Sequence, residues 1–173
     1  QAGAARDALI GVRLVDGTGS VIKNGGRVMK NVTGYDLVKL LAGSRGTLGI
    51  LSEVSFKVQA MPEAETTLII EGFGDEAGLA ALRRALGSPF DVSGVARHAG
   101  RSLIRVEGMA GSVAYRAGRL RDLVGGDVTL VEAGKSAALW REVRDVLPFA
   151  DQPGDVWRII TLPTAAAEIV ARG

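Results

Sequence analysis

Apolar residues occupy every second position of the segment 9–16, which is the pattern of a β-strand with one buried face. The glycine-containing tetrapeptide 16–19 follows and favours a tight turn, and the segment 20–23 then continues as a second strand. A third strand is predicted over the mainly apolar segment 50–58. Together these segments predict a small sheet built around a β-hairpin.

A short amphipathic helix is predicted between the second and third of these strands. Thr33 is followed three residues later by Asp36, which is the spacing of a helix-capping pair. Leu37, Leu40 and Leu41 then share one face of the helix and are expected to pack on the sheet. The next glycine is expected to end the helix.

A glycine-rich loop is predicted between this helix and the third strand. In the segment 43–49 a glycine stands at every third position, which would let backbone N–H groups approach a ligand closely. Such turns are also ordinary connections in α/β domains, so both interpretations remain open. The spacing matches neither a dinucleotide-binding GxGxxG motif nor a P-loop. The start of the helix, next to Lys30 and Asn31, is a place where an anion is expected to bind.

From residue 66 onward the predicted elements follow the order β-α-β-β-α-β, which is that of a ferredoxin-like unit. The predicted strands cover 66–72, 91–97, 102–107 and 127–132, and the predicted helices cover 75–86 and 112–124. Asp75 is expected to cap the first of these helices, with Leu79, Leu82 and Leu86 on its buried face. A helix over 135–146, a strand over 155–162 and a helix over 164–171 are predicted to follow.

The predicted helix 112–124 has one apolar and one basic face. The positions expected to point inward are Val113, Ala117, Leu120 and Val124, and those expected to point outward are Arg116, Arg119 and Arg121. An arginine-bearing face is ordinarily solvated. Contact with a carboxylate substrate, together with Arg101 and Arg105, is the alternative. Trp140 and Trp157 are expected in a core or at a subunit interface.

Composition describes a globular protein and excludes several kinds of site. The chain has 173 residues, of which 47% are hydrophobic and 23% charged. It contains no cysteine, which excludes disulfides, thiolate metal sites and cysteine nucleophiles and fits a reducing cytoplasm. His98 is the only histidine, so a histidine metal cluster is excluded, and a surface or capping role is expected for it. No apolar run is long enough to predict a membrane span. Because the chain begins with Gln1 rather than methionine, it is expected to be part of a longer one.

The net charge is unevenly distributed along the chain, with a positive excess in its first third. Residues 1–60 carry eight Lys/Arg against four Asp/Glu, whereas the remainder has a slight acidic excess. The basic segment suits an anionic ligand such as a pyrophosphate, although a solvated basic face explains it equally well. Nucleic acid is not expected as a partner, because the basic residues are scattered and no aromatic cluster accompanies them.

Two runs carry a resemblance to a known family. The run 26–36, GRVMKNVTGYD, and the run 42–50, AGSRGTLGI, closely resemble the FAD-linked oxidases of the vanillyl-alcohol oxidase type. Within that family the chain is most similar to the FAD-binding flavoproteins of bacterial glycolate oxidase. The resemblance is strong over 7–58 and looser from residue 61 onward.

The resemblance implies an α+β fold in two domains. Residues 1–58 would form the C-terminal half of a PCMH-type FAD-binding domain, whose N-terminal part is missing here. Residues 59–65 would be a linker. Residues 66–173 would form a ferredoxin-like α/β cap domain that is truncated at its C-terminus.

The resemblance also implies which residues contact the cofactor FAD. The expected set comes from the two runs and consists of Asn31, Thr33, Gly34, Tyr35, Gly43, Gly46, Thr47, Leu48, Gly49 and Ile50. Tyr35 could stack or hydrogen-bond at the cofactor, or anchor the helix as a packed aromatic residue. Lys30 could meet a phosphate or the flavin edge, or be an ordinary exposed lysine. No catalytic residue and no metal ligand is predicted.

The function implied by the resemblance is FAD-dependent oxidation of a 2-hydroxy acid, glycolate to glyoxylate, with electrons passed to partner subunits. The expected partners are a homologous FAD subunit and an iron–sulfur subunit in a hetero-oligomer. The expected location is the cytoplasm, with peripheral attachment at the inner membrane through those partners. The fragment alone is expected to be inactive. The alternative is a non-catalytic, flavoprotein-like scaffold subunit: the missing metal-type histidines favour it, and the intact loop 43–49 argues against it.

Overall fold

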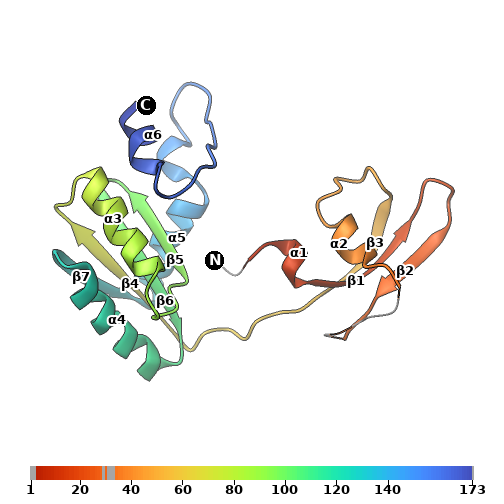
Figure 1. Cartoon of the computed structure of the whole chain (residues 1–173), viewed down its shortest axis with the longest axis horizontal. Coiled ribbons are helices and arrows are strands. Elements are labelled where there is room, and N and C mark those ends of the chain that lie inside the picture. The colour runs from red at the N-terminus through yellow and green to blue at the C-terminus, as the bar shows by residue number, and fades with distance from the viewer. Residues whose placement is uncertain (1–2, 29, 31–33, 173) are drawn as a thin grey trace. The chain divides into compact units, whose positions relative to one another are not determined.

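The computed structural model describes residues 3–28, 30 and 34–172. The chain divides into two compact units, Gln1–Ala60 and Met61–Gly173, which Figure 1 shows with their helices and strands labelled. No helix in the described part of the chain is both long and apolar enough to cross a membrane.

The first unit is a three-stranded antiparallel sheet with two short helices. Its elements are α1 (Ala5–Ala8), β1 (Leu9–Val15), β2 (Val21–Gly25), α2 (Leu37–Leu41) and β3 (Ile50–Phe56). The strand order is β2-β1-β3, and β1 pairs antiparallel with both neighbours. The predicted hairpin and the third strand, which was predicted from its apolar run, are therefore confirmed. The central strand β1 contributes Leu9, Val12 and Leu14 to the core.

The core of the first unit differs from the prediction in the face that α2 buries. Val38 and Leu41 are buried against β1, whereas Leu40 is 60% exposed and Leu37 is half-buried. The side chain of Asp36 accepts a hydrogen bond from the backbone N–H of Lys39 at 3.1 Å, so Asp36 is the N-cap. The expected face of Leu37, Leu40 and Leu41 was wrong because a helix of little more than one turn presents only two positions to the sheet. The other half of the predicted capping pair, Thr33, lies outside the described residues.

The turn between β1 and β2 is organised by one carboxylate. Oδ1 of Asp16 accepts hydrogen bonds from the backbone N–H of Thr18 at 2.8 Å and of Ser20 at 2.9 Å. The Thr18 hydroxyl donates to the same oxygen at 2.7 Å. The Thr18 hydroxyl above all, and then the backbone N–H groups, hold the pKa of Asp16 below its ordinary value, because they stabilise the charged form.

This depressed pKa gives a prediction for acid stability. Because the folded-state pKa lies below the unfolded value, Asp16 stabilises the hairpin above about pH 4 and loses that contribution as the pH falls through the folded pKa. Asp16→Asn keeps an acceptor oxygen but removes the charge. We expect the wild type to have the higher urea midpoint at pH 6 and the difference between the two midpoints to shrink as the pH falls through the folded-state pKa of Asp16. A difference that does not change with pH would contradict this assignment.

The second unit contains a four-stranded antiparallel sheet. Its elements are β4 (Ala64–Glu71), α3 (Asp75–Leu86), β5 (Gly94–His98), β6 (Arg101–Gly108), α4 (Ala110–Val124), β7 (Asp127–Glu132), α5 (Ala133–Arg144), the 3-10 helix η1 (Leu147–Phe149) and α6 (Ala166–Arg172). The strand order is β5-β6-β4-β7, with every neighbouring pair antiparallel. This is the ferredoxin-like arrangement, so the predicted α+β fold is confirmed.

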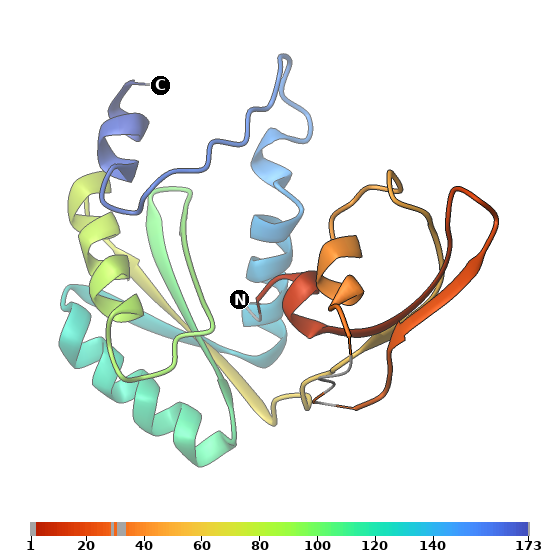
Figure 2. The same ribbon diagram turned by 45° about the vertical axis from the view of Figure 1, so that its right-hand side comes forward.

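Helices cover both faces of this sheet, as Figure 2 shows. On one face, α3 and α4 pack on Leu68 and Ile70 of β4 and on Ile104 of β6. All four residues of α4 that were predicted to point inward are buried. On the other face, Leu139 of α5 packs against Ile69 of β4 and against β6. The sheet is therefore an enclosed core layer rather than an open platform.

Two details of the predicted α3 are wrong. Asp75 is its first residue and not its cap, which is Gly74. The Asp75 carboxylate instead accepts a hydrogen bond from Nε of Arg97 on β5 at 3.0 Å. Leu86 is half-exposed, and the buried face of α3 is formed mainly by glycine and alanine residues. The close packing of α3 on β6 favours alanine and glycine there, because their small side chains let the helix approach the sheet.

The predicted strand over 155–162 is also wrong. These residues, all of which the structure describes, form no strand, and Trp157 is 81% exposed. Alternation of apolar residues identifies a segment that suits a sheet, but a strand forms only where a neighbour can satisfy its backbone N–H and C=O groups. The helix predicted after it is present as α6, which contacts α3.

Candidate functional site

The loop between α2 and β3 is a succession of tight turns. Gly43, Arg45 and Gly46 have φ values of 90°, 52° and 81°, all in the left-handed region. The backbone N–H of Ser44 donates to the carbonyl of Leu41 at 3.0 Å, so the first turn follows the helix directly. The N–H of Thr47 donates to the Ser44 carbonyl at 3.0 Å, and its hydroxyl donates to the same oxygen at 2.7 Å. The loop is thus held in place by its own hydrogen bonds.

The glycines of this loop serve two different purposes. A Cβ atom added to Gly43 or Gly46 would meet no atom within 4 Å, so the space beside the chain is open at both positions. Glycine is favoured there because the backbone adopts a left-handed conformation. A Cβ atom added to Gly49 would lie 2.7 Å from the carbonyl oxygen of Val15 and 2.9 Å from the Leu14 side chain. Gly49 therefore allows the loop to pack directly against β1.

A groove of about 660 Å³ runs beside the loop. The residues that line it come from α1, the loop and β3, and they are Ala4, Ala5, Arg6, Leu9, Leu41, Ala42, Gly43, Ser44, Arg45, Gly46, Gly49, Ile50, Leu51, Val54 and Phe56. Its wall is mainly apolar because Ile50, Leu51, Val54 and Phe56 of β3 are exposed. Of the described residues that line it, none is acidic, whereas Arg6 and Arg45 are both basic. We refer to it below as the large groove.

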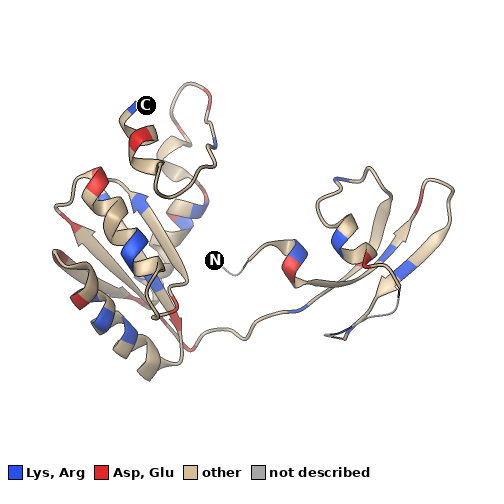
Figure 3. Cartoon of the chain, viewed as in Figure 1, with Lys and Arg blue, Asp and Glu red and all other residues tan. Residues whose placement is uncertain are grey.

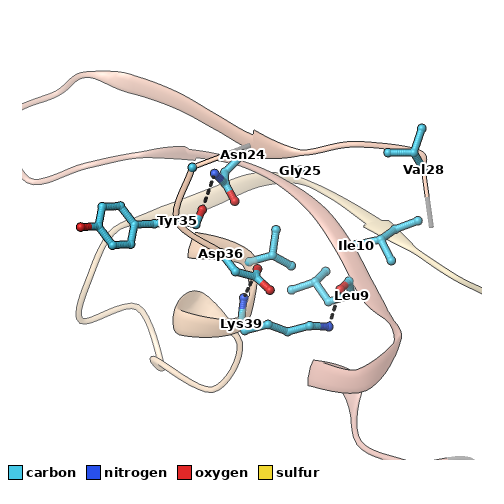
Figure 4. Close-up of a pocket in the computed structure, with 10 residues that line it drawn as sticks. Leu9, Ile10, Asn24, Gly25, Val28, Tyr35, Asp36 and Lys39 are labelled. Atoms are coloured by element: carbon cyan, nitrogen blue, oxygen red, sulfur yellow. Dashed lines mark hydrogen bonds between the residues drawn. The ribbon is translucent and has the colours of Figure 1, made fainter. Parts of the chain in front are cut away.

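A smaller cavity of about 140 Å³ lies between β1, β2 and the start of α2, and Figure 4 shows the residues around it. They include Gly34, Tyr35, Asn24, Asp36 and Lys39. The side-chain amide of Asn24 donates to the backbone carbonyl of Tyr35 at 3.1 Å, which ties the segment before α2 to β2. The ring of Tyr35 points away from the cavity and is 90% exposed. Tyr35 is therefore not the packed aromatic anchor that was one alternative for it.

Lys39 connects α2 to the start of the chain. Its Nζ donates hydrogen bonds to the backbone carbonyls of Arg6 and of Leu9, the latter at 2.9 Å. Both carbonyls belong to the junction of α1 and β1, where unpaired carbonyls at a helix end attract a cation. Sequence reasoning missed this role, because a lysine on a short helix carries no local signal of a partner some thirty positions away.

The structure separates the predicted cofactor residues into several groups. Gly43, Gly46, Gly49 and Ile50 line the large groove, and Gly34 and Tyr35 line the small cavity. Within the described part of the chain, Thr47 and Leu48 line neither cavity. Asn31 and Thr33 lie outside the described residues.

The anion site expected at the start of α2 is not supported. The Asp36 carboxylate already caps this helix, so its N-terminus presents a negative charge rather than free N–H groups. Lys30 is exposed, which is the ordinary state of a lysine. The prediction was wrong because the helix begins after Asp36, three residues later than a Thr33 cap would place it.

The basic residues of the second unit are mostly engaged in structural contacts, and Figure 3 shows them interspersed with acidic residues. Nε of Arg105 lies 3.2 Å from a carboxylate oxygen of Glu107, and its guanidinium carbon lies 4.8 Å from the centre of the Trp140 ring. Nε2 of His98 lies 3.4 Å from Oε2 of Glu142, and only 11% of the histidine side chain is exposed, so His98 is not the surface residue that was expected. Among the described residues, no cluster of histidine, aspartate and glutamate could hold a metal ion.

Arg116 was predicted to point outward, and this is wrong. Only 12% of its side chain is exposed. Its guanidinium donates to the backbone carbonyls of Glu107 at 2.7 Å, Asp91 at 3.1 Å and Phe90 at 3.3 Å. It therefore ties α4 to the loop before β5 and to the end of β6. This removes it from the set of residues that could bind a carboxylate substrate.

Comparison with known proteins relates the chain to FAD-linked oxidoreductases. No family model matches the chain. Its fold is that of an alkyldihydroxyacetonephosphate synthase structure, with a TM-score of 0.60 and 19% identity over 84% of this chain and 32% of that chain. Relatives in sequence include an uncharacterized FAD-linked oxidoreductase of Mycobacterium tuberculosis and D-lactate dehydrogenases.

One sequence relative matches nearly the whole chain. The chain is 39% identical over 165 residues to glycolate oxidase subunit GlcE of Escherichia coli K12, covering 95% of this chain and 44% of that protein. It is also 45% identical over 67 residues to glycolate oxidase subunit GlcD of Bacillus subtilis, covering 39% of this chain and 14% of that protein. The resemblance predicted from the two glycine-containing runs is therefore confirmed: the chain is related to GlcE of glycolate oxidase and to FAD-linked oxidoreductases.

Proposed function

We propose that this chain belongs to a FAD-dependent oxidoreductase subunit that acts on a 2-hydroxy acid, with oxidation of glycolate to glyoxylate as its reaction. The observation that carries the proposal is the 39% identity to glycolate oxidase subunit GlcE, which extends over 95% of the chain and so includes both units. The chain spans less than half the length of that relative, so the activity belongs to the whole protein.

The residues around the large groove fit a flavin. Gly43 and Gly46 have left-handed backbone conformations with open space in front of them, so a planar ring could approach the backbone closely. The apolar wall formed by β3 suits the body of an aromatic ring system. FAD, when bound, supplies the acceptor for the two electrons removed from the substrate.

The contribution of this chain is to bind and orient the cofactor. Gly43, Gly46, Gly49 and Ile50 are proposed to form one wall of its site and to exclude water from it. The other residues proposed as contacts are Asn31, Thr33, Gly34, Tyr35, Thr47 and Leu48, which precede α2 or follow it in the same unit. We assign no catalytic acid or base to this chain.

The domain assignment is part of the proposal. Residues 1–58 are assigned to the flavin-binding domain, 59–65 to a linker and 66–173 to the cap domain. The division of the chain into two compact units between Ala60 and Met61 supports a boundary in this region.

The relatives also suggest how the protein is assembled. GlcE and GlcD are both described as subunits of glycolate oxidase, which supports a hetero-oligomer containing a homologous FAD subunit. An iron–sulfur subunit that takes up the electrons is proposed as the third component. We propose a cytoplasmic complex, with any membrane attachment made through the partner subunits.

The test is the visible absorption spectrum of the purified full-length protein, recorded without oxygen before and after addition of glycolate. We expect a flavin spectrum that glycolate bleaches and that acetate, which lacks the 2-hydroxyl group, leaves unchanged. A flavin spectrum that glycolate does not alter would contradict substrate oxidation by this protein and assign it to a partner. Absence of flavin would contradict the cofactor assignment and favour the scaffold alternative.

A further inference from the structure

Helix α5 is bounded at both ends by residues with a strained backbone. Its first residue, Ala133, has a φ of 44°, and Val146, just beyond its C-cap, has a φ of 55°. Both values lie in the left-handed region, which residues with a side chain disfavour, and a β-branched residue such as valine is an outlier there. Strain of this kind persists only where the surrounding structure imposes it. It is relieved when α5 leaves its place, so it favours movement of the helix.

The apolar contact that holds α5 on the sheet is small. α5 buries Ser136 and Leu139, whereas α4 buries four apolar residues on the opposite face. Leu139 packs against Ile69 and Leu103 in a cluster that is separate from the core beneath α3 and α4. Because hydrophobic stabilisation grows with the apolar area that is buried, α5 is held less strongly than α4.

A chain of hydrogen bonds also holds α5 on the sheet. Nε1 of Trp140 donates to the hydroxyl of Thr67 on β4 at 2.7 Å. That hydroxyl lies 2.7 Å from the hydroxyl of Ser136, which in turn donates to the carboxylate of Glu65. Because a carboxylate only accepts, the proton of Ser136 is used there, and Thr67 is the donor to Ser136. This chain forms only while α5 lies on the sheet.

The ring of Trp140 occupies a slot on the sheet. Gly94 of β5 and Arg105 of β6 are paired in register. A Cβ atom added to Gly94 would lie 3.2 Å from the Trp140 ring, and the guanidinium carbon of Arg105 lies 4.8 Å from the ring centre. The backbone of Gly94 is not left-handed, so glycine suits this position because it leaves room for the ring.

We propose that α5 is a hinged cover that opens from the sheet at Ala133 and Val146, with the ring of Trp140 as its latch. Opening relieves the strain at both junctions and leaves the core beneath α3 and α4 intact. It uncovers the hydroxyl of Thr67 and the guanidinium group of Arg105, so the position of α5 controls the exposure of these two groups. The movement takes place within the second unit and is independent of the flavin.

The experiment is native-state hydrogen–deuterium exchange of the full-length protein, read by mass spectrometry on peptides from α4 and α5. Ala133→Gly and Val146→Gly remove the strain at the two junctions, and Trp140→Leu removes the latch. The matched control is Ala99→Gly. Ala99 has a φ of 48° in the turn between β5 and β6, so glycine relieves the same kind of strain away from α5.

We expect α5 to exchange about tenfold faster than α4 in the wild type, because it opens without unfolding of the whole unit. Ala133→Gly and Val146→Gly should each slow the exchange of α5 about fivefold, since glycine stabilises the closed state but gains nothing from opening. Ala99→Gly should slow α4 and leave α5 unchanged, because its turn stays folded when α5 opens. Trp140→Leu should accelerate α5 about tenfold.

Three results would overturn the proposal. Equal slowing of α5 by Ala133→Gly and Ala99→Gly would show that α5 exchanges only when the whole unit unfolds. Unchanged exchange of α5 in both Ala133→Gly and Val146→Gly would show that the helix does not turn at these residues. Unchanged exchange of α5 in Trp140→Leu would show that the ring is not released when the helix opens.

Discussion

Gly49→Ala is expected to lower the free energy of unfolding of the first unit by about 3 kcal/mol and to abolish retention of flavin by the full-length protein. The added Cβ would lie 2.7 Å from the carbonyl oxygen of Val15, which is backbone and cannot rotate away. The φ of 153° at Gly49 is moreover a conformation that residues with a side chain rarely adopt. Because the clash is with the central strand β1, the loop would be pushed away from the sheet and the groove beside it would lose its shape.

The matched control is Gly46→Ala in the same loop. Gly46 has a φ of 81°, but an added Cβ would meet nothing within 4 Å, so only the left-handed conformation is penalised, by about 1 kcal/mol. Urea denaturation followed by circular dichroism gives both values, and the flavin absorbance of the purified proteins gives the second readout. If the two variants were equally stable, the packing role assigned to Gly49 would be wrong.

Arg116→Met is the second change with a large expected effect, a loss of about 2–3 kcal/mol in the stability of the second unit. Methionine keeps an apolar stem of similar length but removes the donors that serve the carbonyls of Glu107, Asp91 and Phe90. These carbonyls belong to the end of β6 and to the loop before β5. With a side chain that is only 12% exposed, Arg116 leaves little room for water to replace the lost donors.

The control for this prediction is Arg119→Met, which changes the same residue type on the same helix. Arg119 is exposed, and we expect its replacement to alter the stability by less than about 0.5 kcal/mol. The free energies of unfolding from urea titrations are compared at one pH and salt concentration. A loss below about 1 kcal/mol for Arg116→Met would show that the carbonyls find other partners.

The sequence determined most of the secondary structure, since the signals for it are local. Alternation, a turn signal and an apolar run located the three strands of the first unit, and the 3.6-residue period of α4 identified all four of its buried residues. The order of elements indicated the ferredoxin-like sheet, which the strand order β5-β6-β4-β7 confirms. The glycine-rich run 43–49 also identified the loop that lines the large groove. A glycine at every third position indicates a tightly turning backbone, and this can be inferred from the sequence without knowledge of tertiary contacts.

Only the tertiary structure decided which partner each polar side chain finds. Arg116 and Arg119 occupy the same predicted face, yet the fold brings backbone carbonyls to the first and leaves the second exposed. Lys39 bonds to carbonyls some thirty positions away, and Arg6 and Arg45 meet at one groove although the sequence separates them by α2 and two strands. The segment 155–162 has the pattern of a strand but forms none, because pairing requires a neighbour that no local pattern supplies. Periodicity and turn residues act within a few positions, whereas hydrogen-bond partners and the lining of a groove are set by the packing of distant segments.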